Sequence, residues 1–251
     1  MPYGMYLSAA GANAQNHRLE VISHNLANVN TPGFKPQLAM LQARHAEAIE
    51  RGEVSPGAGG IDDIGGGVTF HDPGTLFAQG PLQQTKRQTD FAINDDSSFF
   101  VVARGGQELL TRAGGFMFDA TGTLTTPSGE PVMSTAGTPI KIDPTRHFTV
   151  HDDGRIMQNG LTQSLRLVRS EQPGDLARVG ENYYRPLAQV QNVPPAERRL
   201  VSGHIEQSAV KPTAAMMELI EASRAYEANL RMIQHQDQAM GGLIGRLLKD
   251  G

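Results

Sequence analysis

The sequence predicts an α+β fold in which long N- and C-terminal helices pair as a coiled coil around an inserted antiparallel all-β domain. Two observations carry this prediction. Apolar residues recur in steps of three and four over residues 216–247, which is the spacing of a coiled-coil seam. Between residues 68 and 202, strand-like runs alternate with turn signals at intervals of about 8–12 residues, which is typical of a small barrel or sandwich.

Composition excludes several classes of function. The 251 residues include no Cys and no Trp, so we expect no disulfide framework, thiolate nucleophile or Cys-ligated metal. The formal net charge is −4, which does not favour a nucleic-acid or anionic-membrane partner. No run of residues is long and apolar enough to predict membrane insertion.

The N-terminal helix is expected over residues 3–29. Leu19, Ile22, Leu26 and Val29 step by three, four and three and therefore share one helix face. The helix should end before Pro32, since the residue before proline is pushed out of the helical region. No Lys or Arg precedes Arg18, so the opening does not resemble a cleaved secretion signal.

The end of this helix carries a distinctive turn. Residues 22–35 read ISHNLANVNTPGFK, and Thr31–Phe34 fits a type II turn with Pro32 before a positive-φ Gly33. Phe34 would then need burial against a neighbour, and the asparagines can hydrogen-bond loose backbone groups. We call the following set the Asn-Pro-Gly turn: Asn25, Asn28, Thr31, Pro32, Gly33 and Phe34. The alternative interpretation of this motif is a plain helix C-cap.

The pattern next predicts further helix over residues 37–51 and a Gly-rich linker over residues 52–67. That linker holds seven Gly and one Pro in sixteen positions. No Gly-Lys-Ser/Thr follows its glycines, so a phosphate-binding loop is not expected. The predicted organisation is therefore an N-terminal helical segment (1–51), the linker (52–67), a β-rich outer domain (68–202) and a C-terminal helix (203–251).

Strands are expected where apolar β-formers cluster between turns. Gly105-Gly106 predicts a hairpin, because a type I′ turn needs positive φ at both central residues. Asp119–Gly122 and His151–Gly154 are further turn signals. The expected strands lie near residues 91–93, 99–102, 109–111, 116–118, 123–126, 165–168 and 182–187.

The C-terminal helix shows the strongest periodicity in the chain. Its apolar seam is Met216, Leu219, Tyr226, Leu230, Ile233, Met240, Ile244 and Leu247. Propensity alone does not stabilise so long a helix, so the seam must be covered. One partner helix would leave part of it open. Periodicity by itself leaves two alternatives, a monomeric helix hairpin and self-assembly through the seam of this helix with Leu19, Ile22, Leu26 and Val29.

Three blocks of the chain, one at each end and one of two stretches at the centre, resemble a known family. SHNLANVNTPGFK at 23–35 and IEASRAYEANLRMIQ at 220–234 are similar to the terminal segments of bacterial flagellar rod and hook proteins. QGPLQQTKRQTDFAINDDSSFFVV at 79–102 and LTRAGGFMFDATGTLTTPSGEPVM at 110–133 resemble the β domain of the same family. The resemblance covers nearly the whole chain in the right order. Length and the MPYGMYLSAAGA opening favour the proximal rod member, whereas GHIEQSAVKP at 203–212 resembles the distal one.

The resemblance implies a self-assembling structural subunit of the basal body, not an enzyme. Its terminal helices would form the inner wall of a tube, with the β domain outside, and the rod would carry torque from motor to hook across the periplasm. The implied partners are copies of itself, other rod and hook subunits, and the flagellar type III export apparatus, which passes subunits without a cleaved signal. No cofactor, metal or small-molecule substrate is implied. The competing class, a cell-wall glycan-acting enzyme, would need a raised-pKa carboxylate in a cleft.

Overall fold

The computed structural model describes residues 3–45, 49, 51–53, 55, 65–143, 145–151, 153–170, 172–180 and 182–247. Within them the chain divides into two compact units. The helical unit comprises residues 1–27, 37–74 and 211–251, and the β unit comprises residues 28–36 and 75–210. The α+β class with two helices and an antiparallel β domain is confirmed. Most of the expected linker, residues 54 and 56–64, lies outside the described residues.

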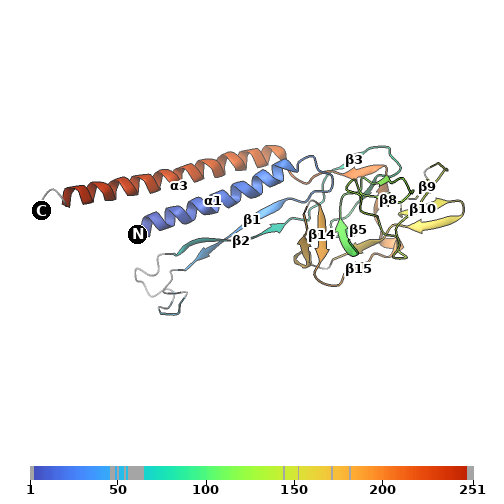
Figure 1. The fold of residues 1–251 in the computed structure, drawn as a ribbon, viewed down its shortest axis with the longest axis horizontal. Coiled ribbons are helices and arrows are strands. Elements are labelled where there is room, and N and C mark those ends of the chain that lie inside the picture. Colours follow the sequence, from blue (N-terminus) through green and yellow to red (C-terminus); the bar gives the residue numbers. More distant parts are fainter. Residues whose placement is uncertain are drawn as a thin grey trace. The chain divides into compact units, whose positions relative to one another are not determined.

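The helical unit contains helix α1 (Tyr3–Ala27), helix α3 (Pro212–Leu247) and a two-stranded ribbon of β1 (Gln37–Arg44) and β2 (Gly67–Thr75) (Figure 1). The two helices run antiparallel and contact each other, and α1 also contacts β1. The N-terminal helix ends two residues before the expected Val29. Within the described residues, neither helix has the length and apolar character needed to span a membrane.

The helix expected over residues 37–51 is wrong for residues 37–44, which form strand β1. The pattern of QLAMLQAR is compatible with a helix, but β2 supplies a hydrogen-bonding partner and α1 supplies a surface to cover. The ring of His17 on α1 stacks on Phe70 of β2 at 4.3 Å between centroids. Tertiary contacts here override a weak local preference.

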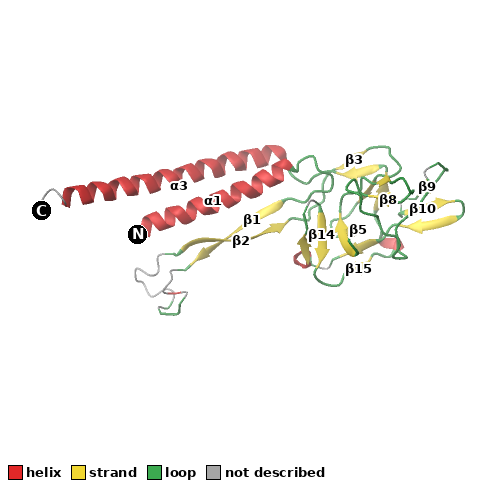
Figure 2. Ribbon diagram, viewed as in Figure 1, coloured by secondary structure: helices red, strands yellow, loops and turns green. Residues whose placement is uncertain are grey.

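The β unit is built on a six-stranded antiparallel sheet with strand order β13-β14-β6-β5-β12-β15 (Figure 2). Its strands are β5 (Ser98–Arg104), β6 (Gln107–Thr111), β12 (Leu167–Arg169), β13 (Leu176–Arg178), β14 (Tyr183–Pro186) and β15 (Gln191–Asn192). The predicted hairpin is confirmed: Gly105 and Gly106 have φ of 58° and 81° and connect β5 to β6.

Smaller sheets surround this one. The pairs are β3 (Leu82–Gln84) with β17 (His204–Glu206), β4 (Phe91–Ile93) with β16 (Leu200–Ser202), and β7 (Met117–Phe118) with β8 (Leu124–Thr125). β9 (Thr149–Val150), β10 (Arg155–Gln158) and β11 (Leu161–Ser164) form a three-stranded sheet. Two short 3₁₀ turns lie at Pro173–Asp175 and Pro195–Glu197.

The central sheet is buried on both faces. Along β5, Phe99 and Val101 belong to one hydrophobic cluster, whereas Phe100 and Val102 belong to another. Because side chains alternate across a strand, the two clusters lie on opposite faces of the sheet. The near-continuous apolar run of β5 in the sequence follows from this double burial.

A buried carboxylate joins three side chains of the β unit through hydrogen bonds. Glu130 is 8% exposed and accepts hydrogen bonds from Tyr183 Oη at 2.7 Å, Arg104 Nε at 2.8 Å and the Thr126 hydroxyl. Burial on its own would raise the Glu130 pKa, but these hydrogen bonds outweigh burial and lower the pKa to about 2.

This lowered pKa predicts a loss of stability in acid. Glu130 contributes stability above the unfolded-state pKa of about 4.5, and the contribution disappears as pH falls through that value toward 2. Between pH 6 and pH 2 the stability advantage of the wild type over Glu130→Gln should shrink by up to ~3 kcal/mol, measured by urea unfolding. Glu197→Gln, which changes an exposed carboxylate, is the control, and an equal shrinkage in both variants would contradict the prediction.

Candidate functional site: the Asn-Pro-Gly turn and the faces of the C-terminal helix

The Asn-Pro-Gly turn forms as the sequence predicts at its centre. Gly33 has φ of 68°, and the Phe34 amide donates to the Thr31 carbonyl at 3.2 Å. A Cβ added to Gly33 would lie 2.5 Å from the backbone atoms Arg112 C and Ala113 N. Glycine is therefore required here both by the positive φ and by the close approach of another backbone.

The turn docks onto the β unit. Phe34 is completely buried, and the Arg178 guanidinium lies 4.6 Å from its ring centroid. Asn182 Nδ2 donates to the Pro32 carbonyl at 2.7 Å, and the Gly33 amide donates to the Glu206 carbonyl at 2.8 Å. The burial expected of Phe34 is thus supplied by the chain's own β unit.

Asn28 and Asn25 form their hydrogen bonds in different units. Asn28 Oδ1 accepts from the Thr31 hydroxyl at 3.2 Å inside the β unit. Asn25 belongs to the helical unit, where its amide pairs with the backbone of Gln37 through two hydrogen bonds of 2.7 and 2.8 Å. Asn25 therefore connects the end of α1 to the start of β1.

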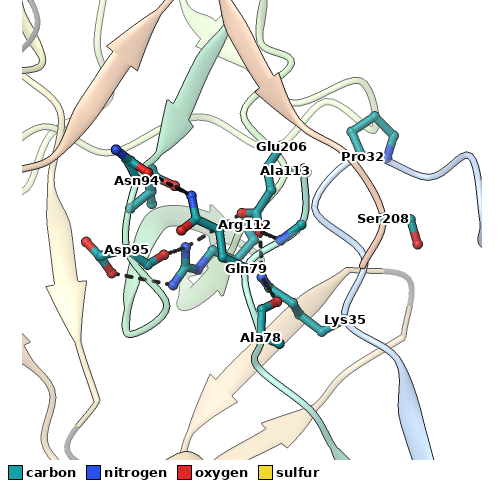
Figure 3. Close-up of polar contacts among 12 residues, drawn as sticks. Pro32, Lys35, Ala78, Gln79, Asn94, Asp95, Arg112, Ala113, Glu206 and Ser208 are labelled. Carbon is teal, nitrogen blue, oxygen red and sulfur yellow. Dashed lines mark hydrogen bonds and ion pairs between the residues drawn. The ribbon is translucent and has the colours of Figure 1, made fainter. Parts of the chain in front are cut away.

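Directly after Phe34, a buried charge cluster fastens the turn (Figure 3). Lys35 is 0% exposed, and its Nζ lies 2.6 Å from Glu206 Oε1 and 2.7 Å from the Ala78 carbonyl oxygen. Glu206, which is 1% exposed, also accepts from the Gly80 amide at 2.7 Å. Arg112 Nη1 lies 3.6 Å from the other carboxylate oxygen of Glu206. We call Lys35, Glu206 and Arg112 the buried cluster.

The electrostatics of the buried cluster depend on one shared carboxylate. Burial lowers the pKa of Lys35, and the charge of Glu206 opposes that shift. Burial also lowers the pKa of Arg112, whose guanidinium donates to the Asp95 carbonyl and lies 3.5 Å from an Asp95 carboxylate oxygen. Asp95 would have its pKa raised by burial, but hydrogen bonds from Ser98 and Ser97 lower it instead. The carboxylate of Glu206 thus offsets part of the cost of burying two cations.

Sequence reasoning missed this cluster. Lys35 and Glu206 are 171 positions apart, and no local pattern pairs residues at that separation. Lys and Glu are rarely fully buried unless paired, so neither residue is marked as a core position by its type.

The face of α3 that packs against α1 only partly coincides with the predicted seam. The buried or half-buried stripe of α3 runs through Ala215, Leu219, Ala222, Tyr226, Asn229, Ile233 and Gln236. A Cβ added to Gly4 would lie 2.9 Å from Gln236 Nε2, and one added to Gly11 would lie 2.9 Å from Asn229 Oδ1. Two glycines on α1 thus allow close approach to small and polar residues of α3.

This packing divides the predicted seam. Leu219, Tyr226 and Ile233 lie on the side of α3 that faces α1. Met216, Leu230 and Ile244 are 53%, 37% and 53% exposed, and Met240 is exposed as well. On α1, Ile22 is buried and Leu19 and Leu26 are half-buried, whereas Val29 lies beyond the helix in the β unit. The side chain of Leu247 lies outside the described residues.

Three of the four exposed seam residues make up what we call the outer stripe: Met216, Leu230 and Ile244. They are spaced by fourteen residues, which is two heptads and therefore one position of a coiled-coil repeat. The side of α3 away from α1 carries the polar residues Glu221, Arg224, Arg231 and His235, together with the exposed Met217 and Met232. Among the described residues, no group of three or more His, Asp or Glu side chains is placed to hold a metal ion.

The geometry of Gly33 gives a direct prediction. Gly33→Ala should destabilise the β unit by more than ~3 kcal/mol, because the added Cβ meets both an unfavourable φ and a rigid backbone. Gly137→Ala is the matched control, since Gly137 has φ of 75° with nothing within 4 Å of its added Cβ. That control should cost only ~1–2 kcal/mol in chemical denaturation. Equal losses in the two variants would contradict the docked turn.

Comparison with known proteins places the chain in a family. The model for "Flagella basal body rod protein" matches residues 5–35, "Flagellar hook protein FlgE/F/G D1 domain" matches residues 92–158, and "Flagellar basal body rod FlgEFG protein C-terminal" matches residues 201–245. These matches fall on α1 with its turn, on the β unit, and on β17 with α3.

Whole-length relatives agree. The chain is 30% identical to flagellar basal-body rod protein FlgF of Caulobacter vibrioides over 99% of each chain. It is 31% identical to FlgG of Bacillus subtilis, over 96% of this chain and 97% of the relative. It is 29% identical to FlgF of Salmonella typhimurium, over 96% of each. Carrying the family's turn, β domain and terminal helices in one continuous order, the chain belongs to the flagellar basal-body rod family.

Proposed function

We propose that this chain is a structural subunit of the bacterial flagellar basal-body rod and polymerises through its helical unit. The observation that carries the proposal is the outer stripe of α3, which α1 leaves exposed. Burying one such Leu, Ile or Met side chain between copies contributes roughly 1.5–3 kcal/mol. Repeated along a helix of 36 residues, this surface can hold neighbouring subunits together.

The same helices support a coiled-coil pairing within each subunit. The steps of four and three along the α1-facing stripe of α3 are the spacing of a coiled coil. Gly4 and Gly11, which are seven residues apart, fit one heptad position on α1. In this proposal one side of α3 serves the subunit's own fold and the next side serves assembly.

The mechanical role follows from the proposed assembly. The terminal helices would form the tube wall and the β unit its outer layer, and the rod would pass torque from motor to hook across the periplasm. Its partners would be copies of itself, other rod and hook subunits, and the export apparatus that delivers the chain without a cleaved signal. Relatives named FlgF and FlgG match at nearly equal identity, so the proposal is a rod subunit at either the proximal or the distal position.

Placing a charge in the outer stripe tests this proposal. Leu230→Asp should block rod assembly and swimming in cells whose own copy is deleted, because a buried unpaired carboxylate is strongly unfavourable. The purified variant should keep wild-type helix content, since the Leu230 side chain is 37% exposed in the single chain.

Ala228→Asp is the matched control, because it adds the same charge on the polar side of the same helix turn. It should assemble and swim. Normal rods with Leu230→Asp, or equal failure of both variants, would contradict assembly through the outer stripe.

A further inference from the structure

The chain passes between its two units at four places, which lie at residues 27/28, 36/37, 74/75 and 210/211. Inside the β unit, the segment 33–36 is hydrogen-bonded to two of the others. The Leu76 amide donates to the Pro36 carbonyl at 2.9 Å, and the Ala209 amide donates to the Phe34 carbonyl at 3.1 Å. The Thr31 amide donates to the Asn28 carbonyl at 3.2 Å, which includes the first exit. The stretch 28–36 thus contains the first two exits and is hydrogen-bonded to residues beside the other two.

The buried cluster lies at this segment and takes its charges from separate parts of the chain. Lys35 comes from the N-terminal turn, and Glu206 comes from β17, the last strand before α3. The loop of Ala78 and Gly80, next to the third exit, supplies one acceptor and one donor to the same two side chains. Arg112, from the end of β6, supplies the second cation.

Each of the two docked segments, the turn and β17, supplies the partner of the buried charge on the other. If β17 were displaced, Lys35 would be buried near Arg112 without the carboxylate that both cations share. If the turn were displaced, Glu206 would keep only Arg112 at 3.6 Å and the Gly80 amide. A buried charge that loses its partner is strongly destabilising, so each docking event depends on the other.

We propose that the Lys35–Glu206 pair is a latch: docking of the N-terminal turn and docking of β17 each depend on the other. The four exits, where the chain crosses between its two units, therefore become ordered together. The latch is a property of the β unit and does not depend on polymerisation. The coupling between the two docking events is reciprocal. A substitution in the turn must therefore weaken the docking of β17 by about the same factor as a substitution in β17 weakens the docking of the turn.

Amide hydrogen exchange of the full-length chain, followed by NMR, tests the latch. Two amides report on opposite ends: Gln207 donates to the Pro81 carbonyl at 2.8 Å, and Leu76 donates to the Pro36 carbonyl. Neither amide bonds to a side chain that is changed. Val101 and Leu110, which pair between β5 and β6, report on the core of the β unit.

Lys35→Met, a change in the N-terminal turn, should speed exchange at Gln207 by at least tenfold. Glu206→Gln, a change in β17, should speed exchange at Leu76 by at least tenfold. Val101 and Leu110 should change less than twofold in both. In the double variant the acceleration should fall well below the product of the two single effects, because either change alone already opens the latch.

Lys141→Met is the matched control, since Lys141 is an exposed lysine of the same unit and should leave both reporters unchanged. Loosening confined to the mutated end would overturn the mutual dependence. Equal loss of protection at the reporters and in the core would overturn it as well, because the cluster would then support the whole unit and not the exits. Multiplicative effects in the double variant would show two independent contacts.

Discussion

The arrangement of the β unit depends on one ion pair, Lys35 with Glu206, which is buried completely and has Arg112 as its neighbour. Removing two charges from water is costly, and only close geometry and further hydrogen bonds offset that cost. Here the Ala78 carbonyl and the Gly80 amide supply those hydrogen bonds. The pair therefore adds specificity: it accepts the turn and β17 in one register and disfavours any partly docked arrangement.

A second constraint sets the surface that remains for assembly. Because Gly4 and Gly11 let α1 approach the stripe of α3 that contains Asn229 and Gln236, the large side chains beside that stripe stay outside. The stripe covered within one chain therefore mixes small and polar residues with Leu219, Tyr226 and Ile233, whereas the outer stripe stays 37–53% exposed.

Features fixed by short-range chemistry were predictable from the sequence. Gly105-Gly106 and Thr31–Phe34 form the expected turns because the required φ angles restrict the residue types to glycine and proline. Residues 37–44 were not predictable as a strand, since their pattern also suits a helix and only pairing with β2 decides between them. The Lys35–Glu206 pair was equally unpredictable from the sequence, because only the folded chain brings these two residues together. Of the predicted seam, Leu219, Tyr226 and Ile233 are half-buried within the chain and Leu230 is exposed, so assembly through the seam stays a prediction.

The central claim is that one side of α3 is covered within the chain and the outer stripe is covered by other copies. The chain has no cysteine, so a single introduced cysteine is the only thiol of this protein that maleimide can label. Maleimide labelling of Met216→Cys, Leu230→Cys and Ala222→Cys, in the purified chain and in isolated basal bodies, tests it directly. We predict that residues 216 and 230 label in the free chain and become protected in basal bodies, whereas residue 222 is protected in both. Equal labelling of residues 216 and 230 in the two states would contradict the account.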